Sequence, residues 1–458
     1  MSFPKYADYT ESQLEYIGPL PSNWDLVPFF SKFIERKESN KGMKNDNLLS
    51  LSYGRIIPKD INTLDGLLPA SYETYQVVHP GDLVFRLTDL QNDKRSLRSA
   101  IVTEEGIITS AYLAVRPKAM NPDFANHLFR CYDQLKVFYS MGGGLRQSMK
   151  YDDMKWLPVV SPSLSEQTQI ARFLDHETAK IDALIAEQKR LINLLQEKRQ
   201  AVISHAVTKG LDPNVPMKDS GVEWLGEVPA HWKQSKLKHF STINGRIGFR
   251  GYTTHDLVDE GDGAITLSPS NMVQGRMDYT KTTYISWDKY YESPEIQLQE
   301  GDIVLVKTGS TYGRVALVDR LIEKTTINPQ LAILRPKNVE AKYFLLFLNS
   351  EYFKAITRNS NTGGTMPTMT QESVMNIIAT LPSLQEQKEI VSAVGELLQD
   401  SEVLESEALK GIDLLKERRA ALISAAVTGK IDVRDWQPPA DESAFDEDVR
   451  KAGLEASA

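Results

Sequence analysis

The sequence predicts an α+β protein: two tandem mixed α/β domains separated by two long helices, packed as an antiparallel coiled coil with pseudo-two-fold symmetry. Three observations in the 458 residues support this prediction. A long helical segment occurs twice, at a constant offset of 220 in the numbering; a short motif opens each domain; and strand-like runs recur between these markers in the same order. Solenoid units span about 20 to 50 residues, so a period this long indicates a duplicated domain together with its helix.

A short motif marks the entry into each domain. Gly18-Pro-Leu-Pro-Ser-Asn-Trp24 and Gly226-Glu-Val-Pro-Ala-His-Trp232 are offset by 208 in the numbering, whereas the helices that follow are offset by 220. The second domain therefore holds a net gain of 12 between its entry and its helix. We expect Trp24 and Trp232 to pack at the domain entry rather than to stack on bases, because tryptophan is usually largely buried.

Three strand-like runs follow each entry motif. Residues 80–88 match 300–308, residues 98–102 match 314–318, and residues 112–118 match 331–337. The apolar stretches indicate strands, while the polar segments between them differ between the two copies. We therefore expect one fold that presents two different loop surfaces.

A long helix follows each domain. Ser163 and Glu166 open the first helix, Ser383 and Glu386 open the second, and a proline precedes each serine. This spacing predicts a capping box, in which each side chain satisfies a backbone N–H at the helix start. Proline before it is typical of extended chain that enters a helix. About 45 residues at about 1.5 Å each extend on the order of 65 Å.

The apolar residues of the two helices predict a coiled coil, because their spacings combine steps of three and four. A helix this long seldom persists without a partner. We therefore favour antiparallel packing over the alternative, in which each helix lies on its own domain. The expected packing residues are Ile181, Leu184, Leu191, Leu195, Val202, Leu404, Leu415 and Leu422.

These elements divide the chain into five parts. We expect a first domain with its entry segment at 1–158, a first long helix at 159–212, a second domain at 213–381 and a second long helix at 382–433. An acidic tail follows at 434–458.

The charge balance is negative overall. The formal net charge is −8, from 53 basic and 61 acidic residues, which by itself argues against a nucleic-acid partner. The acidic run at 441–448 contributes to this excess, whereas several basic residues fall in the variable parts of the domains. Local basic patches therefore decide the question of a nucleic-acid partner.

Several classes of protein are excluded. One cysteine, Cys131, rules out an internal disulfide and a cysteine-rich zinc site, and the seven histidines lack metal-ligand spacing. Neither a nucleophile turn nor the Asn/Asp-Pro-Pro-Tyr/Phe segment of adenine methyltransferases occurs, so we expect a non-catalytic chain. No run has transmembrane length and the start lacks signal-peptide features, which predicts a soluble, cytoplasmic protein.

The chain resembles the specificity subunits of type I restriction-modification enzymes over nearly its whole length. The resemblance rests on the entry motifs, Pro80-Gly-Asp-Leu-Val-Phe-Arg86, Gly309-Ser-Thr-Tyr-Gly-Arg314, Asn328-Pro-Gln-Leu-Ala-Ile333, Gly363-Gly-Thr-Met-Pro367, the Leu-Pro-x-x-Glu-Gln helix starts and the closing Ala-Ala-Val-Thr-Gly429-Lys-Ile-Asp-Val433. It implies two target-recognition domains, each reading one half of a split duplex DNA target. It also implies partners: two modification subunits that bring S-adenosylmethionine and methylate adenine at N6, and restriction subunits that use ATP and magnesium. The chain itself would bind no cofactor.

Polar and basic residues of the variable segments are the candidate DNA contacts, since such side chains bond phosphates and base edges. For any one arginine the alternative is a solvated surface charge, and for residues 93–98 it is a turn with local ion pairs. The candidates of the first domain are Arg55, Lys59, Arg86, Lys94, Arg95, Arg98, Arg146, Gln147 and Lys150. Those of the second domain are Arg246, Arg250, Lys307, Thr308, Ser310, Thr311, Arg314, Gln330 and Thr365.

Two functions from different classes follow. The first is a DNA-reading scaffold that directs a methyltransferase and an endonuclease complex, with the paired helices setting the distance between two unlike half-sites. The second is a non-catalytic interaction scaffold whose two domains bind protein ligands. The diverged polar loops on a duplicated framework favour the first.

Overall fold

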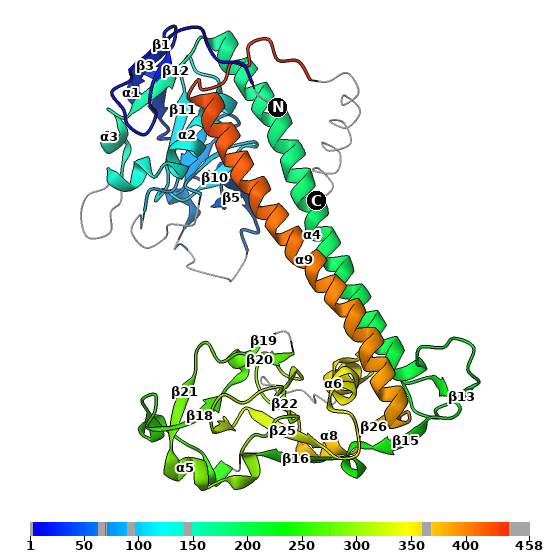
Figure 1. Cartoon of the computed structure of the whole chain (residues 1–458). Helices are drawn as coiled ribbons and strands as arrows, with labels where there is room; N and C mark the ends of the chain where they lie inside the picture. Colours follow the sequence, from blue (N-terminus) through cyan, green and yellow to red (C-terminus); the bar gives the residue numbers. More distant parts are fainter. Residues whose placement is uncertain are drawn as a thin grey trace. The chain divides into compact units, whose positions relative to one another are not determined.

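The computed structural model describes residues 3–62, 69, 71–88, 97–141, 149–246, 248–273, 275–359 and 368–438. The chain forms two compact units, one of residues 1–188 with 409–458 and the other of residues 189–408. Both long helices, α4 (Leu164–Lys209) and α9 (Leu384–Val427), pass from one unit into the other (Figure 1). Each unit therefore contains one mixed domain and one part of both helices.

The domain of the first unit contains two four-stranded sheets, in the orders β6-β5-β10-β7 and β4-β11-β8-β9. Helix α2 contacts β9, and the buried rings of Phe29, Phe33, Phe85 and Phe129 form the centre of the core. The elements are β1 (Tyr9–Thr10), β2 (Leu20–Pro21), β3 (Asp25–Pro28), α1 (Phe29–Lys32), β4 (Phe33–Glu35), β5 (Leu48–Ser52), β6 (Arg55–Lys59), β7 (Gln76–Val78), β8 (Leu83–Phe85), β9 (Ser99–Ile101), β10 (Gly106–Ile108), β11 (Leu113–Pro117), α2 (Pro122–Gln134), α3 (Tyr151–Met154) and β12 (Pro158–Ser161).

The domain of the second unit contains a six-stranded sheet, β16-β25-β22-β23-β20-β19, and a four-stranded sheet, β17-β21-β18-β24. The elements are β13 (Met217–Asp219), β14 (Glu227–Pro229), β15 (Lys233–Lys236), β16 (Ser241–Gly245), β17 (Leu257–Val258), β18 (Gly263–Leu267), β19 (Met272–Val273), β20 (Arg276–Met277), β21 (Thr283–Ser286), α5 (Trp287–Tyr291), β22 (Ile303–Val306), β23 (Val315–Leu317), β24 (Thr325–Ile327), β25 (Leu331–Pro336), α6 (Ala341–Asn349), α7 (Glu351–Asn359), α8 (Gln371–Met375) and β26 (Ile378–Leu381). The mixed α+β fold with two long helices is as the sequence predicts.

The two domains repeat the same hydrogen bonds at the offset found in the sequence. The Tyr132 hydroxyl donates to the carbonyl of Pro158, and the Tyr352 hydroxyl, at the matching position of the second copy, donates to that of Ile378. The duplication is therefore present in the backbone geometry as well as in the residue pattern.

The entry motif and the helix start meet in each unit. The indole of Trp24 donates to Glu166 at 3.0 Å, and that of Trp232 donates to Glu386 at 2.9 Å; both tryptophans are buried, as expected. Only half of the predicted capping box forms, in which the serine hydroxyl accepts the glutamate N–H, as at Ser163. The carboxylates bond the indoles instead, which ties each domain entry to its helix.

The segment that follows α9 contacts residues near the N-terminus in the first unit. The N–H of Asp432 donates to the carbonyl of Pro4 at 2.8 Å, and the Tyr9 hydroxyl donates to that of Gly429. Gly429 ends α9 against Trp24 as Gly210 ends α4 against Trp232, both with positive φ. The end of α9 thus occupies in the first unit the place that the end of α4 occupies in the second.

The helices pack antiparallel, and matched ion pairs mark the packing in each unit. Arg199 of α4 contacts Glu402 of α9 at 3.3 Å in the second unit. Arg419 and Asp182, which the duplication matches to these partners, form the corresponding pair at 3.1 Å in the first unit. The same register therefore holds on both sides of the duplication.

The predicted set of helix packing residues is partly wrong. Ile181 is buried, and Leu195, Val202, Leu415 and Leu422 are half-buried. The other three, Leu184, Leu191 and Leu404, are exposed.

The error is a shift of one residue along the heptad. Ile185 and Ile192, each directly after a predicted leucine, are half-buried, and on α9 the buried residues are Ala408 and Ile412. Adjacent apolar residues such as Leu184 and Ile185 fit two frames of the heptad equally well, so periodicity alone could not choose between them.

Candidate nucleic-acid interface

Several candidate DNA contacts of the second domain gather at one edge of its larger sheet. Strands β16 and β22 both pair antiparallel with β25, with Gly245 opposite Ala332 and Val306 opposite Leu331. The ends of β16 and β22 and the start of β25 therefore meet at this edge. The candidates placed there or in the loop that follows β22 are Arg246, Lys307, Thr308, Ser310, Thr311, Arg314 and Gln330.

Lys307 and Gln371 present two hydrogen-bond donors at this edge. A Cβ atom on Gly245 would lie 2.9 Å from Nε2 of Gln371 and 3.3 Å from Nζ of Lys307, so the glycine leaves room for both groups. Lys307 is half-buried, and desolvation lowers its pKa. An ammonium held in this way gains from an acceptor that replaces the lost water.

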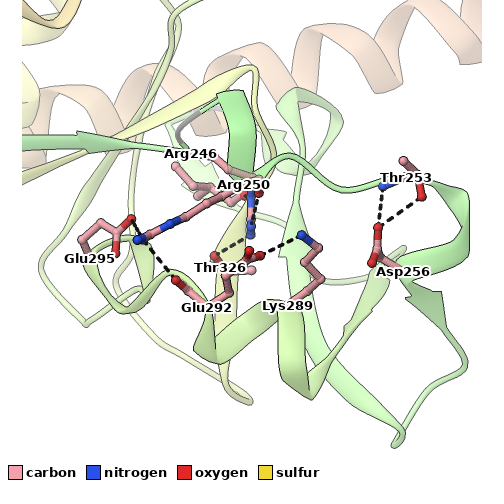
Figure 2. Close-up of polar contacts among 9 residues, drawn as sticks. Arg246, Arg250, Thr253, Asp256, Lys289, Glu292, Glu295 and Thr326 are labelled. Atoms are coloured by element: carbon pink, nitrogen blue, oxygen red, sulfur yellow. Dashed lines mark hydrogen bonds and ion pairs between the residues drawn. The ribbon is translucent and has the colours of Figure 1, made fainter.

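Arg246 has a structural role that the sequence did not reveal. Its side chain is 4% exposed and donates to the carbonyls of Ile327 and Arg250 and to the Thr326 hydroxyl, as Figure 2 shows in part. Arg250 donates to the backbone carbonyl of Glu292 and to the carboxylate of Glu295 (Figure 2). Burial argues against direct contact of Arg246 with DNA, whereas Arg250 is half-buried and ion-paired.

Arg98 of the first domain is also structural. It is 0% exposed, and its guanidinium donates to the carbonyl of Thr88 at 2.8 Å and to that of Arg86 at 3.4 Å. Its backbone N–H donates to Asp133. The expected DNA contact at Arg98 does not fit this placement, since the side chain holds the end of β8 from inside the domain.

The remaining candidates of the first domain are spread over several elements. Arg55 and Lys59 are the exposed first and last residues of β6, Lys150 is exposed at the start of α3, and Arg86 is half-buried after β8. Outside the described residues lie Lys94, Arg95, Arg146 and Gln147, together with Thr365 of the second domain.

An ion pair between a buried aspartate and a half-buried arginine supports the start of β8 in the first domain and of β22 in the second. Asp82 bonds Arg36 at 2.8 Å, and Asp302, its counterpart in the second copy, bonds Arg335 at 2.7 Å. Arg36 follows β4 whereas Arg335 belongs to β25, so the two domains supply the same carboxylate with a cation from different strands. Both aspartates therefore have a structural role.

Among the described residues, no three His, Cys, Asp or Glu side chains are grouped so that they could hold a metal ion. None of the helices in that part of the chain has the length and apolar run that a membrane span requires.

Comparison with known proteins finds a family match within the second half of the chain. Residues 231–410 match the family model of the type I restriction modification DNA specificity domain. The type I restriction enzyme MjaVIII specificity subunit of Methanocaldococcus jannaschii is 24% identical over 279 residues, which cover 60% of this chain and 62% of that subunit. The EcoBI specificity subunit of Escherichia coli is 22% identical over 278 residues, covering 59% and 57%. These matches span less than two thirds of the relatives' own length.

A solved structure shares the fold. It comes from work on complex assembly and conformational transition of the type I R-M system, and covers 89% of this chain and 98% of its own with a TM-score of 0.66 at 17% identity. Residues 231–410 thus match the type I restriction modification DNA specificity domain, and the chain is similar to type I restriction enzyme specificity subunits.

Proposed function

We propose that the chain is the DNA-specificity subunit of a type I restriction-modification enzyme. Each domain reads one half of an asymmetric, bipartite duplex target, and the two helices scaffold adenine-N6 methyltransferase subunits, which restriction subunits join. The chain performs no catalysis and binds no cofactor itself. S-adenosylmethionine belongs to the modification subunits, and ATP and magnesium belong to the restriction subunits.

One observation carries the proposal that the two half-sites differ. The N–H of Met149 donates to the carbonyl of Leu87, and at the matching positions of the second copy the N–H of Met369 donates to that of Lys307. The same backbone hydrogen bond is thus present in both domains, but the first domain has a buried leucine where the second has a half-buried lysine. Different side chains on one framework favour different bases.

Exposed apolar residues support a protein partner on the helices. Leu184 and Leu194 of α4 and Val403 and Leu414 of α9 are all exposed. Leu184 and Leu414 belong to the first unit, and Leu194 and Val403 belong to the second, so each unit has exposed apolar side chains on both helices. Contact with another protein would remove such side chains from water. We assign these side chains to contacts with the modification subunits, and two copies of the helix pattern favour two such subunits.

The lengths of the helices would set the spacer between half-sites. Helix α4 contains 46 residues and α9 contains 44, and the same ion-pair register holds in each unit. A paired helix of this kind is stiff enough to fix a distance on a duplex.

Methylation mapping tests the proposal. Cells that carry this chain with the modification subunit are sequenced by a single-molecule method that detects N6-methyladenine. We expect a split motif with two unlike halves. A stable complex that adds no methylated motif would contradict DNA recognition and favour the protein-interaction scaffold.

A single substitution tests which half-site the second domain reads. Lys307→Leu installs in the second domain the residue that Leu87 supplies in the first. We expect it to relax or change one position of one half-site by about 1–3 kcal/mol of discrimination and to leave the other half intact. Lys281→Leu, at an exposed lysine of the same domain that is not among the candidate contacts, is the matched control.

A further inference from the structure

A cavity in the second unit lies where its domain meets the helices. It has a volume of about 540 Å³ and is lined by residues of α4, β19, the turn before β20, β23, α6 and α7, with Leu398 of α9. All of these residues belong to the unit formed by residues 189–408. The cavity is therefore a feature of one compact body.

Three cations line the cavity, and no acidic residue is among its described lining. They are Arg199, Arg314 and Lys354. Lys354 Nζ donates to the amide oxygen of Gln200, and Arg314 donates to the carbonyl of Met272 at 3.2 Å. Residues 247, 274 and 360–367, the undescribed positions of this unit, include no aspartate or glutamate in the sequence.

The positive charges are only partly balanced. Arg199 contacts Glu402 on the neighbouring helix, but the partners of Arg314 and Lys354 are neutral. Burial and then the nearby Arg199 lower the pKa of Lys354. An anion in the cavity would relieve both effects, since an opposite charge favours the ammonium form.

The corresponding place in the first unit is filled. There the guanidinium of Arg130 lies against Gly54, to whose carbonyl it donates at 2.7 Å, and a Cβ on Gly54 would lie 2.7 Å from that group. Arg130 stands nine residues after Asn121 on α2, and Asn349 stands nine residues after the matching Glu340 on α6. The shorter asparagine leaves the space open.

A glycine shows the difference directly. Gly275 precedes β20 as Gly54 precedes β6, yet a Cβ on Gly275 would meet no atom within 4 Å. The second unit is thus more open at Gly275 than the first unit is at Gly54. An open, cationic space at a place that the sister unit closes indicates a ligand.

We propose that this cavity binds one backbone phosphate of duplex DNA beside the half-site read by the second domain. Lys354 and Arg199 would contact its oxygens, with Arg314 between the phosphate and the bases. The proposal rests on the proposed DNA-reading function and adds a site to it.

Continuity with the reading edge favours DNA over an acidic protein segment. Arg314 lines the cavity and also ends the loop that starts from Lys307 at the edge of the sheet. A duplex in contact with that edge would bring its backbone next to Arg314. Phosphate contacts of this kind fix the position of a protein on DNA without reading sequence.

The test measures salt-dependent DNA binding by the full chain assembled with its modification subunits. Lys354→Gln removes the charge but keeps an amide that can bond Gln200, and Lys354→Arg keeps the charge. Lys388→Gln, an exposed residue of α9 outside the cavity, is the matched control. We expect Lys354→Gln to weaken binding about eight-fold at 0.1 M salt and to reduce the salt slope by about 0.9. The arginine variant and the control should match the wild type.

Phosphate mapping makes the assignment specific. A methylphosphonate placed at each backbone position in turn should weaken the wild-type complex at one position beside the second half-site. The same substitution should add no further loss to Lys354→Gln, because the contact is already absent. The methylated motif should stay unchanged in every variant.

The possible failures are distinguishable. If the wild-type complex bound no duplex, the proposed function itself would be wrong. If it bound its target and Lys354→Gln behaved like Lys388→Gln, only the phosphate assignment would be overturned. If Lys354→Gln instead weakened assembly with the modification subunits at an unchanged salt slope, the cavity would take protein. If Lys354→Gln failed to fold, the Lys354→Arg complex would decide the phosphate assignment. Wild-type DNA affinity and the same methylphosphonate-sensitive position in Lys354→Arg would support the assignment. Weaker DNA binding by the folded Lys354→Arg complex at an unchanged salt slope would contradict it.

Discussion

Replacing Arg98 by alanine should destabilise the first unit rather than change the sequence it reads. The guanidinium is fully buried and donates to the carbonyls of Thr88 and Arg86, while the bond from the Arg98 N–H to Asp133 survives the substitution. Hydrogen bonds from a charged donor contribute about 1.5–3 kcal/mol each. Counting the 3.4 Å bond at the low end and adding the cavity left by the side chain, we expect a loss of about 3–5 kcal/mol.

Hydrogen exchange localises this loss. The amides of β8 and β9 should exchange faster in Arg98→Ala, while those of the second unit keep their protection. Arg55→Ala, an exposed arginine of the same unit, should change stability by less than about 0.5 kcal/mol. If Arg98→Ala kept wild-type protection and thermal stability but lost methylation directed by one half-site, Arg98 would be a DNA contact and the structural role would be wrong.

Three further predictions concern pH, the ion pairs of Asp82 and Asp302, and the helices. Burial raises the pKa of Tyr352 to about 12, so the folded state keeps a proton that the unfolded state loses near pH 10. The free energy of unfolding therefore falls as the pH rises from about 10 to about 12. In alkaline denaturation curves, Tyr352→Phe should remove about 2–3 kcal/mol of that fall. Asp82→Asn and Asp302→Asn should each cost about 1.5–3 kcal/mol, because the arginine left behind is half-buried and stays partly hydrated, and hydrogen exchange should show the loss in the mutated unit alone. One heptad inserted into both α4 and α9 should lengthen the spacer of the methylated motif and leave both halves unchanged; an active complex with the original spacer would rule out the helices as a ruler.

The insertion has to be made in both helices because of the ion-pair register. Arg199 meets Glu402 in one unit and Arg419 meets Asp182 in the other. A heptad added to α4 alone would shift one of these pairs by seven residues against its partner. Loss of activity in that single insertion would then reflect broken packing and would not test the spacer.

Local sequence predicted what depends on spacing and duplication. The two copies of Ser-x-x-Glu and of the entry motif located the domain entries and the helix starts, and the structure has both. What spacing could not give was the bond between Trp24 and Glu166, because these residues are brought together only by the fold. The half-formed capping box follows from this bond, since the carboxylate that would have closed the box accepts the indole instead.

Residue type alone did not separate DNA contacts from structural cations. Arg98 and Arg246 lie in polar, variable segments like the exposed Arg55 and Arg314, yet both are buried among carbonyl groups. Whether a guanidinium bonds the backbone or faces solvent depends on the strands around it, which the sequence pattern does not place. Conversely, the sequence pattern does not single out Lys354, because its helix lies outside the variable loops. Only the fold sets Lys354 beside Arg199 and Arg314.

In each unit, the domain and its parts of the two long helices share one apolar core. Ile203, Ala206 and Val207 of α4 and Ile390 and Val394 of α9 are part of the apolar core of the second domain. A fragment cut at the expected domain bounds of 213–381 would expose this surface, as would one cut at 1–158 for the corresponding contacts in the first unit. A rotation of either helix would therefore move the reading edge with it, because the same side chains fix the helix and the domain. Under the proposed function, half-site identity would change through residues such as the half-buried Lys307 without disturbing this core, whereas the distance between half-sites would change with the helices.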